Sequence, residues 1–232
     1  MDRNSNKYTF IYASVMVVLV AAVLSIAAMA LKPLQKKNTE IEKKQNILAS
    51  VNIITTPKNA EEVYARKILN SYVVNSEGEV IEGNAFDVEL RIEKTKPLEK
   101  RQLPVFECQT DDGLKYIFPL RGAGLWGPIW GYIALNDDLN TIYGANFDHQ
   151  AETPGLGAEI STPPFQEAFK GKKIFDASGN LVSIIVAKAN ESALEQHRVD
   201  AVSGGTITSK GLEQMLLNDL KSYQNFITRK KS

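Results

Sequence analysis

Residues 200–209, with the sequence DAVSGGTITS, combine two glycines with several hydroxyl and acid side chains. A helix with an apolar stripe is predicted directly after them, over residues 209–228. The first backbone N–H groups of a helix have no partner inside the helix, and together with the helix dipole they form a site for an anion. Ser203 and Thr206 add hydroxyl groups just before this predicted helix. The pattern is therefore compatible with a phosphate site.

The same segment also fits a turn that binds no ligand. Gly204 and Gly205 allow the positive φ angles of a tight turn as well as a close approach of the backbone to a ligand. Thr208 or Ser209 is a natural N-cap for the helix that follows. Because a short cluster of serine, glycine and threonine is a weak signal by itself, these residues leave both a phosphate site and a capping turn open.

Three other stretches favour a flat ligand. The loop ETPGLG at 152–157 places turn-forming residues around one leucine, and GAGLWGPIW at 122–130 holds both tryptophans of the chain. An aromatic ring there can stack on a planar ligand, although we expect Trp130 in the core or at a contact between subunits. Lys188 ends the apolar segment LVSIIVAK, where a cation either faces an anionic group or simply returns to solvent. We predict that these stretches share one pocket with the 200–209 segment.

Composition limits the classes of partner and site. The 232 residues carry 27 basic and 27 acidic side chains, so the zero net charge argues against nucleic acid as the main partner. Cys108 is the one cysteine, so the chain can form neither an internal disulfide nor a CxxC site. His149 and His197 are too few for a histidine-rich metal site, and we expect no metal.

An apolar segment near the N-terminus predicts a membrane anchor. Residues 9–31 contain no charged side chain and as a helix would span roughly 34 Å, enough for a hydrocarbon core of about 30 Å. A cleaved signal peptide is the alternative, since Ala28 and Ala30 resemble a cleavage site. Signal peptides usually have a shorter apolar region, so we favour an uncleaved span. The lysines that follow the span would by count place the large domain in the cytoplasm.

The remaining sequence predicts an extramembrane α+β domain with a mostly antiparallel sheet. A juxtamembrane helix or stalk is expected after the span, and a short helix over residues 60–69. Segments that alternate between apolar and polar residues predict strands; they lie at 71–83, 86–94, 103–109, 115–120, 129–136 and 141–147. A short helix is predicted at 165–171 and a hairpin at 174–188. The last helix carries an apolar stripe of Leu212, Met215, Leu216, Leu220, Tyr223, Phe226 and Ile227.

The combination of these motifs resembles a known family. Residues 200–206, DAVSGGT, are similar to the D-x-x-[S/T]-G-x-T flavinylation motif, and HQAETPGLG and GLWGPIWGYIAL occur in the same chain. Together they resemble NqrC, the flavin-carrying member of the bacterial sodium-translocating NADH:quinone reductase, or Nqr complex. The resemblance covers most of the chain, including the apolar N-terminal segment.

The resemblance implies covalently bound FMN. The acceptor of its phosphate would be Thr206, joined by a phosphoester bond that a separate flavin transferase makes with FAD as donor. Asp200 and Ser203 would belong to the motif that the transferase recognises, together with Gly204 and Gly205. Gly205 stands where alanine is commonest in the family, and we expect attachment to survive this difference. The flavin pocket would include Trp126, Glu152, Thr153, Leu156 and Lys188.

The resemblance also implies a place in the cell and a role. Residues 1–8 would be cytoplasmic, 9–31 the transmembrane helix, 32–58 the stalk and 59–232 a periplasmic FMN-binding domain, against the lysine count. The chain would relay electrons inside a complex with the A, B, D, E and F subunits of Nqr, which oxidises NADH, reduces quinone and exports Na+. It would catalyse no complete reaction alone, and its membrane segment would contact lipid.

Two alternatives remain. The G subunit of the related Rnf complex carries the same flavin motif, although the GLW and ETPGLG contexts favour Nqr. A membrane-anchored scaffold without a cofactor would need all of the motifs to be structural coincidences. A hydrolase has little support, because the sequence shows no plausible Ser/His/Asp arrangement.

Overall fold

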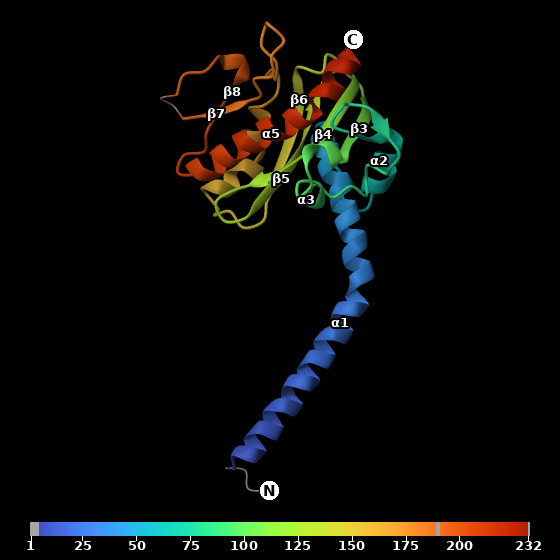
Figure 1. Cartoon of the computed structure of the whole chain (residues 1–232), viewed down its shortest axis with the longest axis vertical. Helices are drawn as coiled ribbons and strands as arrows, with labels where there is room; N and C mark the ends of the chain where they lie inside the picture. Colours follow the sequence, from blue (N-terminus) through green and yellow to red (C-terminus); the bar gives the residue numbers. More distant parts are fainter. Residues whose placement is uncertain (1–4, 189–190, 232) are drawn as a thin grey trace. The chain divides into compact units, whose positions relative to one another are not determined.

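The computed structural model describes residues 5–188 and 191–231, and the chain divides into two compact units, Met1–Lys43 and Lys44–Ser232. The first unit consists of most of helix α1, Asn6–Ala49, drawn in blue in Figure 1. Its most apolar window has a mean hydropathy of 2.7, and the helix is long enough to cross a membrane. The large apolar side chains from Phe10 to Leu34 are exposed, as lipid-facing side chains would be. The helix continues through Pro33, so the predicted span and the start of the stalk form one helix.

The second unit is built on one antiparallel sheet of six strands in the order β2-β1-β3-β4-β5-β6. The strands are β1 (Ile68–Val74), β2 (Val80–Ile81), β3 (Leu103–Thr110), β4 (Gly113–Ala123), β5 (Pro128–Leu135) and β6 (Ile142–His149). Two short strands, β7 (Ile185–Ala187) and β8 (Arg198–Asp200), form a separate parallel pair. The predicted α+β class with a mostly antiparallel sheet is confirmed.

The helices of this unit differ greatly in length. The longest is α5, Thr206–Lys231, shown in red in Figure 1. The other α-helices are α2 (Ala60–Lys67), α3 (Leu90–Glu93) and α4 (Pro163–Glu167). Short 3-10 helices occur at η1 (Leu98–Lys100), η2 (Gly157–Ser161) and η3 (Glu195–His197).

Both faces of the sheet are buried. On one face, the predicted stripe of α5 packs on β4, with Phe118 and Tyr223 in edge contact at 5.0 Å between ring centroids. On the other face, Ile47 at the end of α1 packs with Phe106 and Ile117. Ile117 and Phe118 are neighbours in β4 and point to opposite faces, as the two-residue period of a strand requires. The sheet therefore carries two cores, and α5 is fixed along one of them.

A buried carboxylate with a partly exposed lysine partner holds α5 against β4. The Asp219 carboxylate accepts a hydrogen bond from the backbone N–H of Arg121 at 2.7 Å, and its other oxygen lies 2.5 Å from Lys94 Nζ. Lys94 also donates to the carbonyl oxygen of Arg121. A buried carboxylate is costly unless it is paired and hydrogen-bonded. The pairing therefore sets the position of α5 along β4.

The predicted strand at 86–94 is wrong. Asn84 Oδ1 accepts the backbone N–H of Phe86 and begins a turn, and α3 follows. The buried Glu93 carboxylate accepts hydrogen bonds from Lys96 and from the backbone N–H of Gln102. Alternation of apolar and polar residues did not predict these local bonds, which satisfy the backbone without a strand partner.

The predicted hairpin at 174–188 is only partly present. Its turn forms, because Asp176 accepts the backbone N–H of Asn180, and Phe175 pairs with Leu181 in an isolated antiparallel bridge. The chain then leaves the hairpin at Ser183, which has a φ of 60°. The following residues form β7, which pairs in parallel with β8. This pairing brings residue 188 beside the segment that leads into α5.

Candidate functional site

Helix α5 begins at Thr206, three residues before the predicted start. Gly204 has a φ of 75°, so the turn before the helix uses the left-handed region that glycine adopts without strain. The prediction that Thr208 or Ser209 is the N-cap is therefore wrong. Ser209 Oγ accepts the backbone N–H of Val202 at 3.1 Å, and Thr208 Oγ1 donates to Glu152.

Burial separates the hydroxyl groups of this segment. Thr208 and Ser209 are each about 1% exposed, whereas Ser203 is exposed and Thr206 is half-buried. A group attached to Thr208 or Ser209 would require the helix start to open. Thr206 is the hydroxyl that lies both at the first residue of α5 and within reach of the surface.

The 152–157 loop packs directly on the glycine turn. A Cβ placed on Gly204 would lie 2.6 Å from Leu156 Cδ2, and one on Gly205 would lie 3.2 Å from the Leu156 carbonyl carbon. The Thr153 carbonyl oxygen accepts the backbone N–H of Leu156 at 3.1 Å and so closes the loop. The structure thus brings together two of the segments that the sequence predicts to share a pocket.

Glu152 joins this loop to the segment that carries Trp126. Its side chain is 5% exposed, and Oε1 accepts the backbone N–H of Trp126 at 2.9 Å. Oε2 accepts the hydroxyl of Thr208 at 2.5 Å. Residues from three separate parts of the chain therefore meet at one carboxylate.

Large apolar side chains are exposed on these three segments. Trp126 is 66% exposed and Ile207, which follows Thr206, is 58% exposed. Leu125 and Leu156 are also among the exposed apolar residues. Exposed apolar side chains from segments that meet mark a binding surface more often than scattered single ones do. We call Leu125, Trp126, Leu156 and Ile207 the apolar platform.

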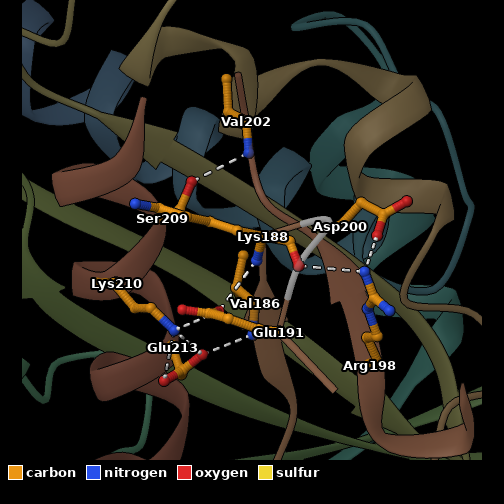
Figure 2. Close-up of polar contacts among 9 residues, drawn as sticks. All are labelled: Val186, Lys188, Glu191, Arg198, Asp200, Val202, Ser209, Lys210 and Glu213. Carbon is orange, nitrogen blue, oxygen red and sulfur yellow. Dashed lines mark hydrogen bonds and ion pairs between the residues drawn. The ribbon is translucent and has the colours of Figure 1, made fainter. Parts of the chain in front are cut away.

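Lys188 and Asp200 lie on the parallel pair that leads into the turn. In the register, Ala187 stands opposite Asp200, and the Ala187 carbonyl oxygen accepts the backbone N–H of Ala201 at 2.8 Å. Figure 2 shows Arg198 between the two predicted site residues: its Nη2 donates to Asp200 Oδ1 at 2.9 Å and to the Lys188 carbonyl oxygen at 3.4 Å. Lys188 is exposed, and its backbone carbonyl oxygen and N–H bond Arg198 and Glu191.

An ionic cluster attaches this region to α5. The Glu191 carboxylate accepts the backbone N–H of Lys188 at 3.0 Å and pairs with Lys210 Nζ at 3.1 Å (Figure 2). The bond from Lys188 and the Lys210 ammonium hold the pKa of the Glu191 carboxyl below its ordinary value. Glu213 of α5 accepts the backbone N–H of Val186 at 2.7 Å. The first turns of α5 thus position β7 and the residue that follows it.

Sequence reasoning missed three residues of the site. Thr208 enters as a buried hydrogen-bond donor, and Leu125 and Ile207 enter as members of the platform. Leu125 precedes Trp126 and Ile207 follows Thr206 in the sequence. This adjacency to a predicted site residue was the available signal. Trp130, expected in the core or at a contact between subunits, is half-buried on β5 opposite Arg121.

The site suits a ligand with an anionic end and a flat apolar body. The start of α5 favours the anion, the turn before it leaves little room for side chains at Gly204 and Gly205, and the platform offers aromatic and aliphatic surface. Residues 124–221 match the FMN-binding domain family. Site and family together define a flavin-binding protein.

Similarity to curated relatives extends over almost the whole chain. The C subunit of the Na(+)-translocating NADH-quinone reductase from Haemophilus ducreyi is 31% identical, with 91% of this chain and 88% of the relative covered. Its counterpart from Pseudomonas aeruginosa is 31% identical, with 93% and 91% covered. The chain belongs to the NqrC family, the C subunits of Na(+)-translocating NADH-quinone reductases.

Solved structures agree with this assignment. The crystal structure of the NqrC protein from Parabacteroides distasonis superposes with a TM-score of 0.80 at 49% identity, covering 85% of this chain and 97% of that one. The crystal structure of Shewanella oneidensis NqrC gives a TM-score of 0.71 at 26% identity, covering 84% and 99%. The Nqr assignment is therefore confirmed over the Rnf alternative, and the chain is a flavoprotein subunit of a sodium-translocating NADH:quinone reductase.

Proposed function

We propose that this chain relays electrons through FMN joined to Thr206 by a phosphoester bond. The observation that carries the proposal is the position of Thr206: it is the half-buried first residue of α5, and it directly follows the glycine turn on which Leu156 packs. FMN supplies the redox chemistry when bound, and the residues of the chain hold and orient it.

The phosphate end would lie at the start of α5, where the helix dipole and the first backbone N–H groups favour negative charge. Thr208 and Ser209 are poor acceptors because both are buried and both hydroxyls are engaged. A transferase that uses FAD would join Thr206 Oγ1 to the FMN phosphate and release AMP. Ser203 and Asp200 are exposed and so accessible to such an enzyme.

The ring would rest on the platform. Trp126 and Leu156 supply aromatic and aliphatic surface, and Thr153 holds the loop closed through its carbonyl group. Lys188 would supply positive charge from the parallel pair. Glu152 belongs to the site through its bonds to the Trp126 and Thr208 segments.

The membrane segment would keep this domain within the Nqr complex, beside the A, B, D, E and F subunits. We propose that residues 9–31 remain as a transmembrane helix and that the flavin domain lies in the periplasm. Covalent attachment suits this location, because a cofactor held by a phosphoester is not lost outside the cytoplasm. The complex would oxidise NADH, reduce quinone and export Na+.

The test is expression of the full chain together with a flavin transferase, followed by denaturing electrophoresis with in-gel flavin fluorescence. The parent and Thr208→Val should give a fluorescent band, and Thr206→Ala should give a folded chain without one. Mass spectrometry of peptides should place the flavin on Thr206. A flavin on Thr208 or Ser209, or a parent band without fluorescence, would contradict the proposal.

A further inference from the structure

We infer that Glu152 is a positioning residue that couples the Trp126 segment to the first turn of α5. The inference rests on the proposed function in one respect, namely that the two coupled segments carry the flavin platform and the attachment residue. Glu152 would act through the groups it holds, because each oxygen of its carboxylate already accepts a hydrogen bond from the chain.

The contacts of Glu152 reach three segments that are far apart in the sequence. Thr208, which donates its hydroxyl to Oε2 at 2.5 Å, is 56 positions away. Trp126, which donates its backbone N–H to Oε1 at 2.9 Å, is 26 positions away. The backbone N–H of Glu152 itself donates to His149 Nδ1 at 3.2 Å, at the end of β6. The carboxylate thus connects the β4–β5 connection to the start of α5, and the Glu152 backbone N–H attaches the same residue to the end of β6.

Two glycines give the carboxylate its space. A Cβ on Gly157 would lie 2.5 Å from Thr208 Oγ1 and would also collide with Glu152 Oε2. A Cβ on Gly124 would lie 2.9 Å from the carboxylate carbon of Glu152. Such separations are far below normal contact, so a side chain at either position would push the hydrogen-bonded groups apart. The backbone at Gly157 and at Gly124 therefore lies close against the Glu152 carboxylate.

The burial of this carboxylate makes its two hydrogen bonds costly to lose. A carboxylate that is 5% exposed is costly unless hydrogen bonds compensate for the lost water. Here two donors compensate, and Thr208 belongs to the first turn of α5, where the helix dipole favours negative charge. If one donor is removed, the carboxylate oxygen left without a partner favours a move toward water. The bond from the carboxylate to the other donor then weakens. A change in the first turn of α5 should therefore also loosen the Trp126 segment.

Hydrogen exchange of the Trp126 backbone amide measures this coupling directly. In the full chain without flavin, Thr208→Val removes a hydroxyl from α5 without touching Trp126. We expect the amide of Trp126 to exchange at least about threefold faster, as for residues that share a hydrogen-bond network. Glu152→Ala should accelerate it about tenfold, the loss of one bond to a charged group. Glu152→Gln should largely restore protection, since its amide can accept from Trp126 and donate to Thr208.

A matched variant and an internal reference keep the result specific. Ser222→Ala removes another buried hydroxyl of α5, one that bonds the Asn218 carbonyl oxygen within the helix, and it should leave Trp126 unchanged. Rates at Trp126 are divided by those at Ile133 in β5, so that any global opening cancels. Exchange at Trp126 that is the same in Thr208→Val as in the parent would overturn the inference.

A second measurement connects the coupling to the flavin. In chains that carry it, Thr208→Val should lower the fluorescence anisotropy of the attached flavin, because the platform moves relative to Thr206. Unchanged anisotropy in Thr208→Val and Glu152→Ala would contradict a positioning role for Glu152. A parent without flavin would instead contradict the proposed function, while the exchange experiment would still decide whether Glu152 couples the segments.

Discussion

Gly211 of α5 lies against the backbone carbonyl of Ala123 at the end of β4, with no room for a Cβ between them. Four residues along the helix, Met215 packs on Gly122, where a Cβ would lie 2.7 Å from Met215 Cβ. This approach of backbone to backbone brings the start of α5 beside the segment that carries Leu125 and Trp126. The distance between Thr206 and the Leu125–Trp126 segment therefore depends on a residue that belongs to neither.

Gly211→Ala should destabilise the domain by about 2 kcal/mol, although alanine is the better helix former, because overpacking against a backbone carbonyl forces the helix away from the sheet. Urea unfolding followed by circular dichroism gives the free energy. Gln214→Ala, at an exposed position of the same helix, should change stability by less than about 0.5 kcal/mol. Equal stability of Gly211→Ala and the parent would show that the helix can shift freely.

Alanine at the two glycines of the motif should have different effects. Gly205→Ala should retain flavin attachment, because the new Cβ would meet Val202 at 3.1 Å, which is tight but within reach of a small adjustment. Gly204→Ala should reduce attachment and cost about 1 kcal/mol, because the φ of 75° is strained for alanine. In-gel flavin fluorescence normalised to protein compares the two. Loss of attachment in Gly205→Ala alone would reverse the expectation.

Leu156→Ala should leave attachment intact and expose the ring to solvent. The leucine lies over Gly204, so its removal opens one side of the space beside Thr206. Iodide should then quench the flavin fluorescence more strongly than in the parent. Leu98→Ala is a matched control, because Leu98 and Leu156 are both 42% exposed and Leu98 lies on η1. Equal quenching in both variants would place the ring elsewhere.

Glu107 predicts a dependence of stability on pH. Burial raises the pKa of its carboxyl, but hydrogen bonds from Asn70 and Tyr72, with the charge of Lys230, outweigh burial and bring the pKa below its ordinary value. As the pH falls to about 4.3, the Glu107 carboxyl takes up a proton in the unfolded chain before it does so in the folded chain. The stability that the Glu107 carboxylate contributes to the folded state is therefore present above that pH and is lost as the pH falls through the lowered pKa.

Glu107→Gln should remove that contribution, so its stability should fall less steeply with acidification than that of the parent. Urea unfolding at a series of pH values between neutrality and about pH 3, where carboxyl groups titrate, measures the two slopes. Parallel slopes would show that other carboxyl groups account for the acid sensitivity.

The orientation of the anchor can be tested with two reporters fused after the last residue. A periplasm-active reporter should work and a reporter active only in the cytosol should not. Activity of the cytosolic reporter alone would reverse the proposed topology, in agreement with the lysine count. N-terminal sequencing of the mature chain tests cleavage separately, because a sequence starting at Leu31 would show that the anchor is removed.

Local sequence was sufficient to predict those elements whose structure depends on residues close in the chain. The strands from 103 to 147 alternate or run apolar because the sheet is buried on both faces, and the stripe of α5 follows from helical geometry. The flavin motif is contiguous, so residues 200–206 could be identified without a fold. At 86–94, however, alternation was misleading, because side chains such as Asn84 and Glu93 bond the backbone locally.

The site itself was determined by the tertiary structure. Sequence indicated which segments are unusual, but the contact of Leu156 with Gly204 and the bonds of Glu152 to Trp126 and Thr208 join residues dozens of positions apart. Those pairs meet because the sheet order places β4, β5 and β6 side by side and because Gly211 lets α5 approach β4 closely. Side-chain types therefore determined the chemistry available to this chain, whereas the packing of α5 on the sheet decided which side chains share one site, since only close packing fixes distances between segments that no local bond connects.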